Sequence, residues 1–496
     1  MTATASLRPS HIAGLAAGVA ALIAGLVLPP PAPITDLGMA RLGLLAFAII
    51  WWLATPLPLP MTTVAMLGAG VATGALSVSG AFAHSGSWVL WFVMGSFGIA
   101  TALETTGLNR RVALAFLDAP WARGSSGRFL MMFLASATAM SILMANTIVA
   151  VVWLALAVRI YALLSVEHED PLVESNTLGI AWAANIGGIA SPISNGTNVV
   201  AMGMTAAATG VGVTFLQWTL LGTALTLVFL ASALALFWLG PAGRSRTLDR
   251  PEVTRFVSAE RRSLGTMTVV ERWAAIWMGI AIGLWFLPDL VAAVAPGSVG
   301  EAVRRSLHMT VPALLVPIAM CVLPVPGAGG ARVLTWDQWM RGVDWPLLLF
   351  VGGVMGLGTA VGEEVTGVGA FVRTAVEPWL AGLSEYAFVL AMSATVIAMT
   401  ALLSNMVALT ILLPLGISIA SGLGIADSAA VGLLIGIGIS LDYSLPSGTT
   451  TNAIVAGSGY LRVATMIRYG VPLSVIHAVL LTFVGYPLAK LILRGL

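Results

Sequence analysis

Residues 191–198 read Ser-Pro-Ile-Ser-Asn-Gly-Thr-Asn, and residues 445–452 read Leu-Pro-Ser-Gly-Thr-Thr-Thr-Asn. Each stretch interrupts a long apolar run with proline, glycine, hydroxyl groups and an amide. Such residues are not typical of a helix that only crosses lipid, because every backbone group that a break frees needs a hydrogen-bond partner. Two such breaks in one chain are typical of a transporter whose binding site lies near the middle of the membrane.

Each break follows a second polar motif that lies in an apolar segment. Residues 144–147 read Met-Ala-Asn-Thr before the first break, and residues 403–406 read Leu-Ser-Asn-Met before the second. The flanking sequences match in the same order, since residues 92–102 resemble residues 350–360. We therefore interpret the chain as two repeats, each with an Asn-bearing hairpin followed by a broken helix.

The composition places the whole chain in a membrane. Of its 496 residues, 58% are apolar and 9% are charged, and the mean hydropathy is +0.97. No soluble domain of this length has such a profile. With about 20 apolar residues per span, the chain has room for about a dozen spans. The net charge of +2 gives no support for nucleic acid binding.

The apolar runs predict an all-α polytopic membrane protein with about eleven transmembrane helices and two re-entrant hairpins. The hairpins are expected at residues 129–164 and 384–425, with the Asn-bearing motifs at their turns. Two spans are expected to be interrupted, at residues 191–198 and 446–452. The expected spans cover residues 11–28, 38–54, 61–80, 88–105, 176–209, 215–240, 273–294, 308–324, 345–362, 428–459 and 471–493.

Basic residues predict the orientation. If the amino terminus is cytoplasmic, the loop with Arg110, Arg111, Arg123 and Arg128 falls inside, and so does the long segment 241–272. This segment holds seven Arg against four acids, which agrees with the positive-inside rule. The same parity puts the carboxyl terminus outside and opens the two hairpins to opposite sides. We expect two inverted repeats in an integral protein of the inner or plasma membrane.

The chain then divides into five parts. Residues 1–87 and 273–344 are expected to be scaffold helices, and residues 88–240 and 345–496 the two inverted repeats. Residues 241–272 are interpreted as a solvated cytoplasmic connector with room for an amphipathic helix, rather than as a separate domain.

The polar motifs offer ligands for an anion and for a cation. Broken helices present free N–H groups at half-helix amino termini, while unwound carbonyls and Asn or Thr oxygens coordinate metal ions. No Lys or Arg lies within the motifs. An anion would then be held by neutral donors, helix dipoles and co-bound cations, which favours coupling to Na+. No organic cofactor is expected.

In these motifs the chain resembles the divalent anion/Na+ symporter family of the ion transporter superfamily. The most specific match is Leu-Pro-x-x-Thr-x-x-Asn-Ala-Ile-Val-x-Gly-Ser-Gly at residues 445–459, and the resemblance covers approximately residues 40 to 490. It implies a homodimeric carrier of succinate, malate, citrate or sulfate that works by an elevator mechanism. It also implies eleven spans and two re-entrant hairpins.

The resemblance assigns roles to particular residues. Na+ ligands are expected at Ser141, Asn146, Thr400 and Asn405. Substrate contacts are expected from both repeats, at Asn146, Thr147, Ser194, Thr197, Asn198, Ser404, Asn405, Thr450, Thr451 and Asn452.

The chain departs from the Ser-Asn-Thr hairpin motif of the family at two positions. Ala145 lacks the first hydroxyl, and Met406 replaces the last threonine with an apolar thioether. Loss of a hydrogen-bond partner for a charged group costs about 1.5 to 3 kcal/mol. A standard dicarboxylate is therefore expected to bind less well, unless Asn195 or Thr449 compensates.

Asp442 lies in the second interrupted span, four residues before Pro446. An acid within the membrane is a functional candidate, here as a Na+ ligand or as the carrier of a coupling proton. The alternative is that Asp442 faces cytoplasmic water or caps a helix.

These observations predict a secondary active transporter of a di- or tricarboxylate-like or inorganic divalent anion, coupled to Na+. An anion exchanger or an H+-coupled carrier of an atypical substrate is the alternative. A channel or a polytopic membrane enzyme is more distant, because the sequence has no metal-binding His cluster, nucleophile elbow or nucleotide-binding Gly-Lys-Ser/Thr loop. The expected partners are a small anion, the lipid bilayer and a second copy of the chain.

Overall fold

The computed structural model describes residues 9–122, 125–165, 170–239, 251–380 and 382–495. All regular secondary structure in this part of the chain is helical, which confirms the predicted all-α class. Ten of the described helices are long and apolar enough to cross a membrane. The number becomes eleven if the bent pair α14 (Ser298–Ser306) and α15 (Thr310–Val322) counts as one span.

The three longer helices before the first repeat are α1 (Pro9–Val27), α2 (Asp36–Ala54) and α3 (Leu59–Ala72). The third expected span was predicted to reach residue 80, but α3 ends earlier. Gly74 turns the chain directly after it with a φ of 73°, a conformation that favours glycine. The short helices α4 (Val78–Phe82) and η1 (Ala83–Gly86) then lead to the first repeat.

The first repeat consists of a long helix, a short helix, a hairpin, a broken helix and a final helix. Its short helix lies in a segment that the sequence suggested to be a basic loop. In chain order the elements are α5 (Trp88–Thr106), α6 (Leu108–Leu117), η2 (Pro120–Ala122), the hairpin α7 (Ser126–Ser141) and α8 (Asn146–Leu164), the broken helix α9 (Pro171–Gly187) and α10 (Gly196–Thr209), and α11 (Phe215–Leu239).

The second repeat has the same order of elements. The repetition expected from the sequence is therefore present in the helices, while the domain boundaries and the inversion stay predictions. The elements are α17 (Trp345–Gly362), η4 (Glu364–Thr366), α18 (Val368–Leu380), the hairpin α19 (Glu385–Leu402) and α20 (Asn405–Gly422), the broken helix α21 (Ser428–Gly438) and α22 (Thr450–Ala456), and α23 (Val463–Leu480) joined by a π-helical turn (Leu481–Gly485) to α24 (Tyr486–Gly495).

Between the repeats lie α12 (Pro251–Ser263), α13 (Val269–Val294), α14, α15 and α16 (Trp336–Gly342). Helix α12 belongs to the expected connector, and its Glu260 pairs with Arg110 of α6 and Arg159 of α8. Helix α12 is thus packed against the first repeat. Residues 1–8, Arg123 and residues 241–250 lie outside the described residues.

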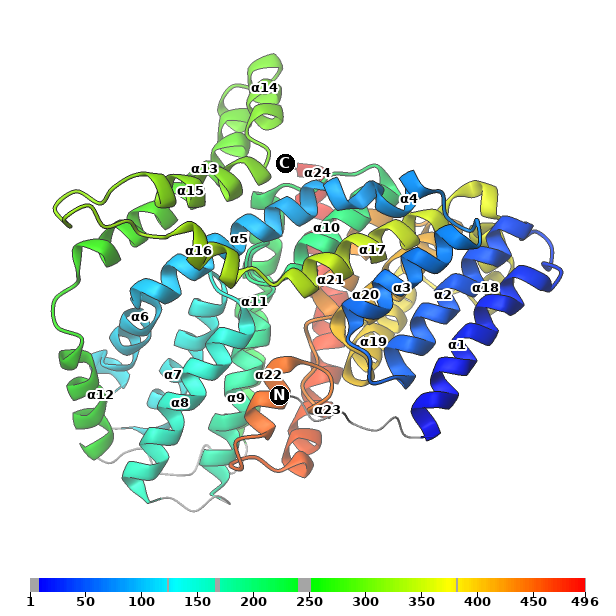
Figure 1. The fold of residues 1–496 in the computed structure, drawn as a ribbon. Coiled ribbons are helices and arrows are strands. Elements are labelled where there is room, and N and C mark those ends of the chain that lie inside the picture. The colour runs from blue at the N-terminus through cyan, green and yellow to red at the C-terminus, as the bar shows by residue number, and fades with distance from the viewer. Residues whose placement is uncertain (1–8, 123–124, 166–169, 240–250, 381, 496) are drawn as a thin grey trace.

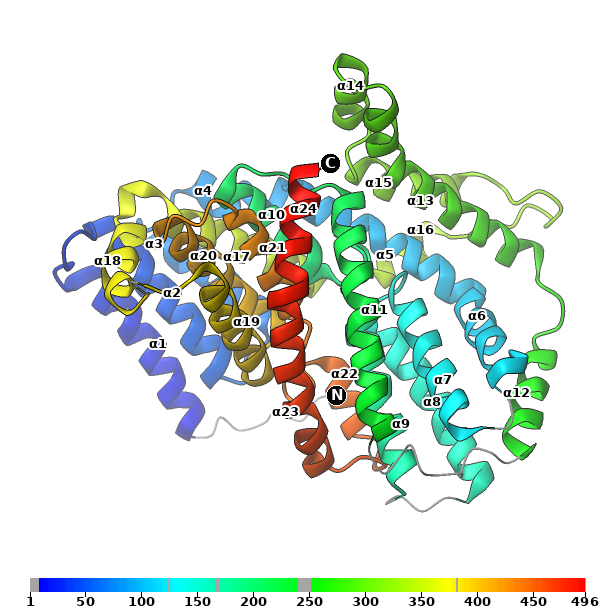
Figure 2. The ribbon, with the colours of Figure 1, turned by 180° about the vertical axis from the view of Figure 1, so that it is seen from behind.

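Figure 1 shows α1, α2, α3 and α18 on one flank of the molecule and α6, α12, α13, α15 and α16 on the other, while α14 projects from the top. The hairpins and broken helices lie between the two flanks. Helix α1 begins at the lower edge of the view and α24 ends at the upper edge. Seen from behind in Figure 2, α11 and α23–α24, which close the two repeats, stand side by side.

The two helix breaks lie somewhat earlier in the chain than predicted. They cover residues 188–195 and 439–449 rather than 191–198 and 446–452. The helices resume early because Asn195 and Thr449 act as N-caps, accepting hydrogen bonds from Thr197 N and Asn452 N. The second break is longer because α21 ends at Gly438.

The broken helices form the centre of the core. All residues from 172 to 187 in α9 and from 429 to 438 in α21 are buried. A helix buried on every side is typical of the interior of a large membrane bundle. Trp182 of α9 stacks on Phe237 and donates its indole N–H to Tyr443 O at 3.2 Å, so the first repeat is fastened to the second break.

A buried carboxylate joins the two repeats far from the breaks. Glu174 of α9 accepts from Arg462 Nε at 2.7 Å, from Arg462 Nη2 at 3.1 Å and from Thr465 Oγ1 at 3.0 Å. The side chain of Glu174 is 6% exposed, whereas that of Arg462 is 58% exposed. The pair therefore satisfies an acid that the fold has removed from solvent.

We expect Arg462→Ala to destabilise the protein by about 2 kcal/mol, because two charge-assisted hydrogen bonds are lost and Glu174 stays buried. Thermal unfolding in detergent measures this. The matched control is Arg255→Ala, which removes an exposed pair with Glu252 within α12 and should change stability by less than about 0.5 kcal/mol. Equal unfolding temperatures for the two variants would contradict the expectation.

Candidate functional site

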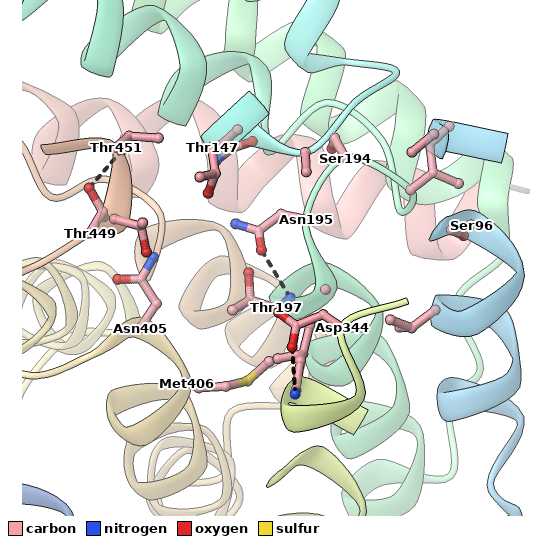
Figure 3. A pocket seen from close by; sticks show the side chains of 18 of the residues that line it. Ser96, Thr147, Ser194, Asn195, Thr197, Asp344, Asn405, Met406, Thr449 and Thr451 are labelled. Atoms are coloured by element: carbon pink, nitrogen blue, oxygen red, sulfur yellow. Dashed lines mark hydrogen bonds between the residues drawn. The ribbon is translucent and has the colours of Figure 1, made fainter. Parts of the chain in front are cut away.

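A cavity of about 290 Å³ lies where both hairpin tips meet both helix breaks (Figure 3). One wall comes from these four elements and the other from α5 and the first turn of α17. The lining residues are 145–147, 192–197, 404–406 and 448–451, together with Asn185, Phe92, Val93, Ser96, Phe97, Ala100, Asp344 and Leu347.

The first hairpin carries a cluster of oxygens at its tip. Ser141, the last residue of α7, has its Oγ 2.9 Å from Asn146 Oδ1 and 2.7 Å from the carbonyl oxygen of Ala184 in α9. Gly188 packs directly against the Asn146 amide, and a Cβ at this position would collide with it. The first hairpin is thereby held to the end of the first broken helix.

The second hairpin carries the same arrangement. Thr400 Oγ1 lies 2.7 Å from Asn405 Oδ1 and 2.8 Å from the carbonyl oxygen of Ile439, directly after α21. Hydroxyl, amide and carbonyl thus recur in both repeats at corresponding places.

Each cluster brings together more acceptors than its hydroxyl can serve. A hydroxyl has one hydrogen and donates it to one acceptor, yet Ser141 Oγ and Thr400 Oγ1 each face an amide oxygen and a carbonyl oxygen. Three oxygens gathered in this way are the kind of ligand set that hard cations take in proteins. The two clusters are therefore candidate cation sites, and their residues fit the Na+ predicted from the sequence.

Asp442 lies next to the second cluster and does not line the cavity. It is 0% exposed, so it does not face bulk water. Its Oδ2 accepts from Asn452 Nδ2 at 2.9 Å and its Oδ1 from Ser444 N at 3.2 Å. A Cβ on Gly448 would collide with the Asp442 carboxylate and would come within 3.0 Å of Thr400 O. The second candidate cation site therefore has an acid beside it.

The two Asn residues that follow the breaks brace the backbone from behind the cavity wall. Asn198 Nδ2 donates to Gly188 O at 2.7 Å and to Ser191 O at 2.9 Å. Asn452 Nδ2 donates to Leu445 O at 2.9 Å as well as to Asp442. Both residues are 0% exposed and neither lines the cavity. Their predicted direct contact with substrate stays a prediction.

The other predicted substrate contacts do gather at the cavity. Ser194 uses its hydroxyl internally, against Gly188 O and Ser191 O, whereas Thr197 Oγ1 is buried and has no partner among the described residues. The predicted residues that line the cavity are Asn146, Thr147, Ser194, Thr197, Ser404, Asn405, Thr450 and Thr451.

Several lining residues were not predicted from the sequence. Asn185 reaches the second break, where its Oδ1 accepts from Thr451 Oγ1 at 2.8 Å and its Nδ2 donates to Asp442 O at 3.3 Å. The α5 residues and Asp344 form the opposite wall. Asn185 could have been found as an amide in an otherwise apolar span six residues before Ser191. Asp344 gives no such signal, because it precedes an expected span.

Two hairpin tips and two helix breaks around one cavity, within a bundle of apolar helices, define a membrane transporter rather than an enzyme. The family model for the "sodium:sulfate symporter transmembrane region" matches residues 10–493. The chain belongs to this family, which confirms the resemblance found in the sequence.

The chain also matches individual relatives along most of its length. A transporter of Haemophilus influenzae described as uncharacterized is 26% identical, and the matched region covers 90% of each of the two chains. The sodium-dependent dicarboxylate transporter SdcS of Staphylococcus saprophyticus is 23% identical, and the matched region covers 97% of this chain and 92% of that transporter.

Two solved transporter structures share the fold. The YdaH transporter of Alcanivorax borkumensis is similar with a TM-score of 0.56 at 16% identity, over 85% of this chain and 89% of that one. MtrF of Neisseria gonorrhoeae is similar with a TM-score of 0.54 at 15% identity, over 98% and 95%. At these identities the likeness concerns the fold alone.

Gly448→Ala should destabilise the protein by about 1 to 3 kcal/mol, because its Cβ would press on the Asp442 carboxylate and on the backbone at Thr400. The control is Gly283→Ala in α13, where a Cβ meets open space and stability should stay unchanged or rise slightly. Thermal unfolding of both variants in detergent tests this. A Gly448→Ala protein as stable as the control would show that Asp442 lies elsewhere.

Proposed function

We propose that this protein is a secondary active transporter that couples the movement of a small anion to Na+ by elevator-type alternating access. The observation that carries the proposal is the pair of hydroxyl, amide and carbonyl clusters at Ser141 and Thr400, placed under the two tips of one cavity. The sodium:sulfate description of the family and the Na+-dependent dicarboxylate transport named for SdcS support it.

In the proposed mechanism, Na+ binds at the two clusters. Ser141 and Asn146 supply side-chain oxygens to one ion, and Thr400 and Asn405 to the other, each with a backbone carbonyl. Because Asn146 and Asn405 also line the cavity, they connect each ion to the substrate. The bound ions then supply the positive charge that the lining residues lack.

The anion binds in the cavity between the tips. Helix α8 begins there without a side-chain cap, because Ala145 is its N-cap residue. Its first N–H groups, at Asn146 and Thr147, are therefore free to donate to an anion at the positive end of the helix dipole. Hydroxyls from the second repeat, at Ser404 and Thr450, supply further donors around the cavity, whereas Thr451 Oγ1 already donates to Asn185 Oδ1.

The two walls of the cavity suggest how access alternates. The hairpins and broken helices, with both clusters, form one wall, and α5 with the first turn of α17 forms the other. We propose that the first wall moves as a unit against the second, which carries the site across the membrane. Residues 1–87 and 273–344 would act as the scaffold, in a homodimer with a cytoplasmic amino terminus and an outside carboxyl terminus.

Asp442 favours a second candidate, an H+-coupled carrier or an anion exchanger. It is a fully buried acid beside the Thr400 cluster, and the corresponding residue of the first repeat is Gly188 when Pro192 is aligned with Pro446. A proton on this carboxylate could replace the second Na+. In the Na+-coupled mechanism, the Asp442 carboxylate instead provides an additional negative charge beside the second Na+.

The Na+ site is tested by Thr400→Val, which keeps the shape of the side chain and removes one ligand. We expect the Na+ concentration that half-maximally raises the unfolding temperature to increase at least about tenfold, or about 1.4 kcal/mol. The matched control is Thr395→Val in the same helix, because Thr395 is exposed and donates only to Ala391 O. An unchanged Na+ dependence in Thr400→Val would remove this residue from the cation site.

The coupling ion is tested by uptake into liposomes that contain the purified protein. A Na+ gradient at equal pH should drive uptake of the anion, and Asp442→Asn should weaken this Na+ dependence. Uptake driven by a pH gradient alone, and lost in Asp442→Asn, would instead establish H+ coupling. Counterflow that persists without any cation gradient would establish exchange.

A further inference from the structure

The cavity contains an acid that the proposed mechanism does not use. Among the residues that line it, the one with an ionisable side chain is Asp344, and no Lys, Arg or His takes part. Asp344 is exposed, lines the cavity and forms no ion pair among the described residues. A site for a dianion would thus face a negative charge on its own wall.

Asp344 also occupies a place where an anion could have bound. It is the N-cap of α17, and its Oδ1 accepts from Leu347 N at 3.0 Å. The carboxylate therefore neutralises the positive end of this helix, which would otherwise offer N–H groups to a ligand. In contrast, α8 on the other wall is uncapped at Ala145.

The remaining helix ends at the cavity are capped as well. Asn195 caps α10, Ser404 caps α20 and Thr449 caps α22, each with its own side-chain oxygen. Of the helices that begin at the cavity, α8 is the one whose N-cap residue has no side-chain oxygen to compete with a ligand at the first turn. The first turn of α8 is therefore suited to an anionic group.

The end near Asp344 also lacks one side-chain hydroxyl that the other hairpin tip has. Met406 is 7% exposed and lines the cavity at the position that corresponds to Thr147 in the other hairpin. Its thioether is at most a weak acceptor. Figure 3 shows Met406, Thr197 and Asp344 together at the lower end of the view, and Thr147 toward the upper end. Thr197 also lines the cavity there, but its Oγ1 is buried and has no partner among the described residues.

We propose that Asp344 and Met406 determine the charge of the substrate: it carries a single negative group, and its opposite end is uncharged or cationic. This proposal rests on the proposed function and narrows its substrate class. The negative group binds at the uncapped end of α8, where Thr147 and the cation beside Asn146 stabilise it. A second carboxylate would meet a thioether in place of a donor and a like charge on α17, both of which disfavour binding.

Three four-carbon acids of similar length provide the test, because they differ at one end only. Succinate carries a carboxylate there, butyrate a methyl group and 4-aminobutyrate an ammonium group. We would measure the dissociation constant of each for the purified full-length protein in saturating Na+, by thermal shift and by isothermal titration calorimetry. Butyrate or 4-aminobutyrate should bind at least tenfold more tightly than succinate.

Two substitutions should change this preference in a defined way. Asp344→Asn keeps the N-cap of α17, because Asn is an equally good cap, and should tighten succinate binding at least fivefold with little effect on butyrate. Addition of Met406→Thr restores a hydroxyl and should make succinate the preferred ligand. The matched control is Asp337→Asn, an exposed acid of α16 outside the cavity, which should leave all three constants unchanged.

The outcomes separate this inference from the proposed function. Succinate binding more tightly than both butyrate and 4-aminobutyrate in the wild-type protein would overturn the inference and leave Na+-coupled anion transport intact. An unchanged preference in Asp344→Asn would also overturn it. If none of the three acids binds and no Na+ gradient drives uptake of any of them or of sulfate, both the inference and the proposed function fail.

Discussion

A helix that stops inside a membrane leaves backbone carbonyl and N–H groups that no solvent can satisfy, and the architecture of this protein depends on how those groups are partnered. Both repeats use the same solution, in which one Asn behind each break donates its side-chain amide to carbonyls that the break has freed. Asn198 donates to the carbonyls of Gly188 and Ser191. Asn452 donates to the carbonyl of Leu445. Side-chain caps then restart the helices. With the polar backbone satisfied from behind, the front of each break is left to face a cavity.

The hairpins likewise use one polar side chain for two purposes. In each hairpin one hydroxyl forms a hydrogen bond with a carbonyl of the neighbouring broken helix. Ser141 bonds to Ala184 O, and Thr400 bonds to Ile439 O. That contact both fastens the hairpin and assembles three oxygens beneath its tip. Trp182 and Asn185 add connections between the repeats. The fold and the candidate cation sites therefore depend on the same hydrogen bonds. A change in the occupancy of a site would alter how the hairpin packs against the helix.

Most of this arrangement was predictable from the sequence, because apolar runs and their interruptions are strong signals in a membrane protein. The hairpins, the pair of breaks and eight of the ten predicted substrate contacts all appear at or beside the cavity. What the sequence did not predict depends on tertiary packing. Asn198 and Asn452 turn away from the cavity because the freed carbonyls lie behind them. Asp344 reaches it because α17 begins against the hairpin tips, although the residue reads as an ordinary helix cap.

In each hairpin tip, the residues of the candidate cation site and the residues that line the cavity lie a few positions apart in the chain. Ser141 and Thr400 lie one helical turn before the tip and point to the helix behind, whereas the residues after the tip Asn, Thr147 and Met406, line the cavity. Cation affinity and ligand preference can then be altered by different substitutions. The hairpin tip is in this sense an exchangeable recognition module, and libraries that vary tip residues 145, 147 and 406 together with Asp344 would change ligand preference while the two candidate cation sites stay as they are.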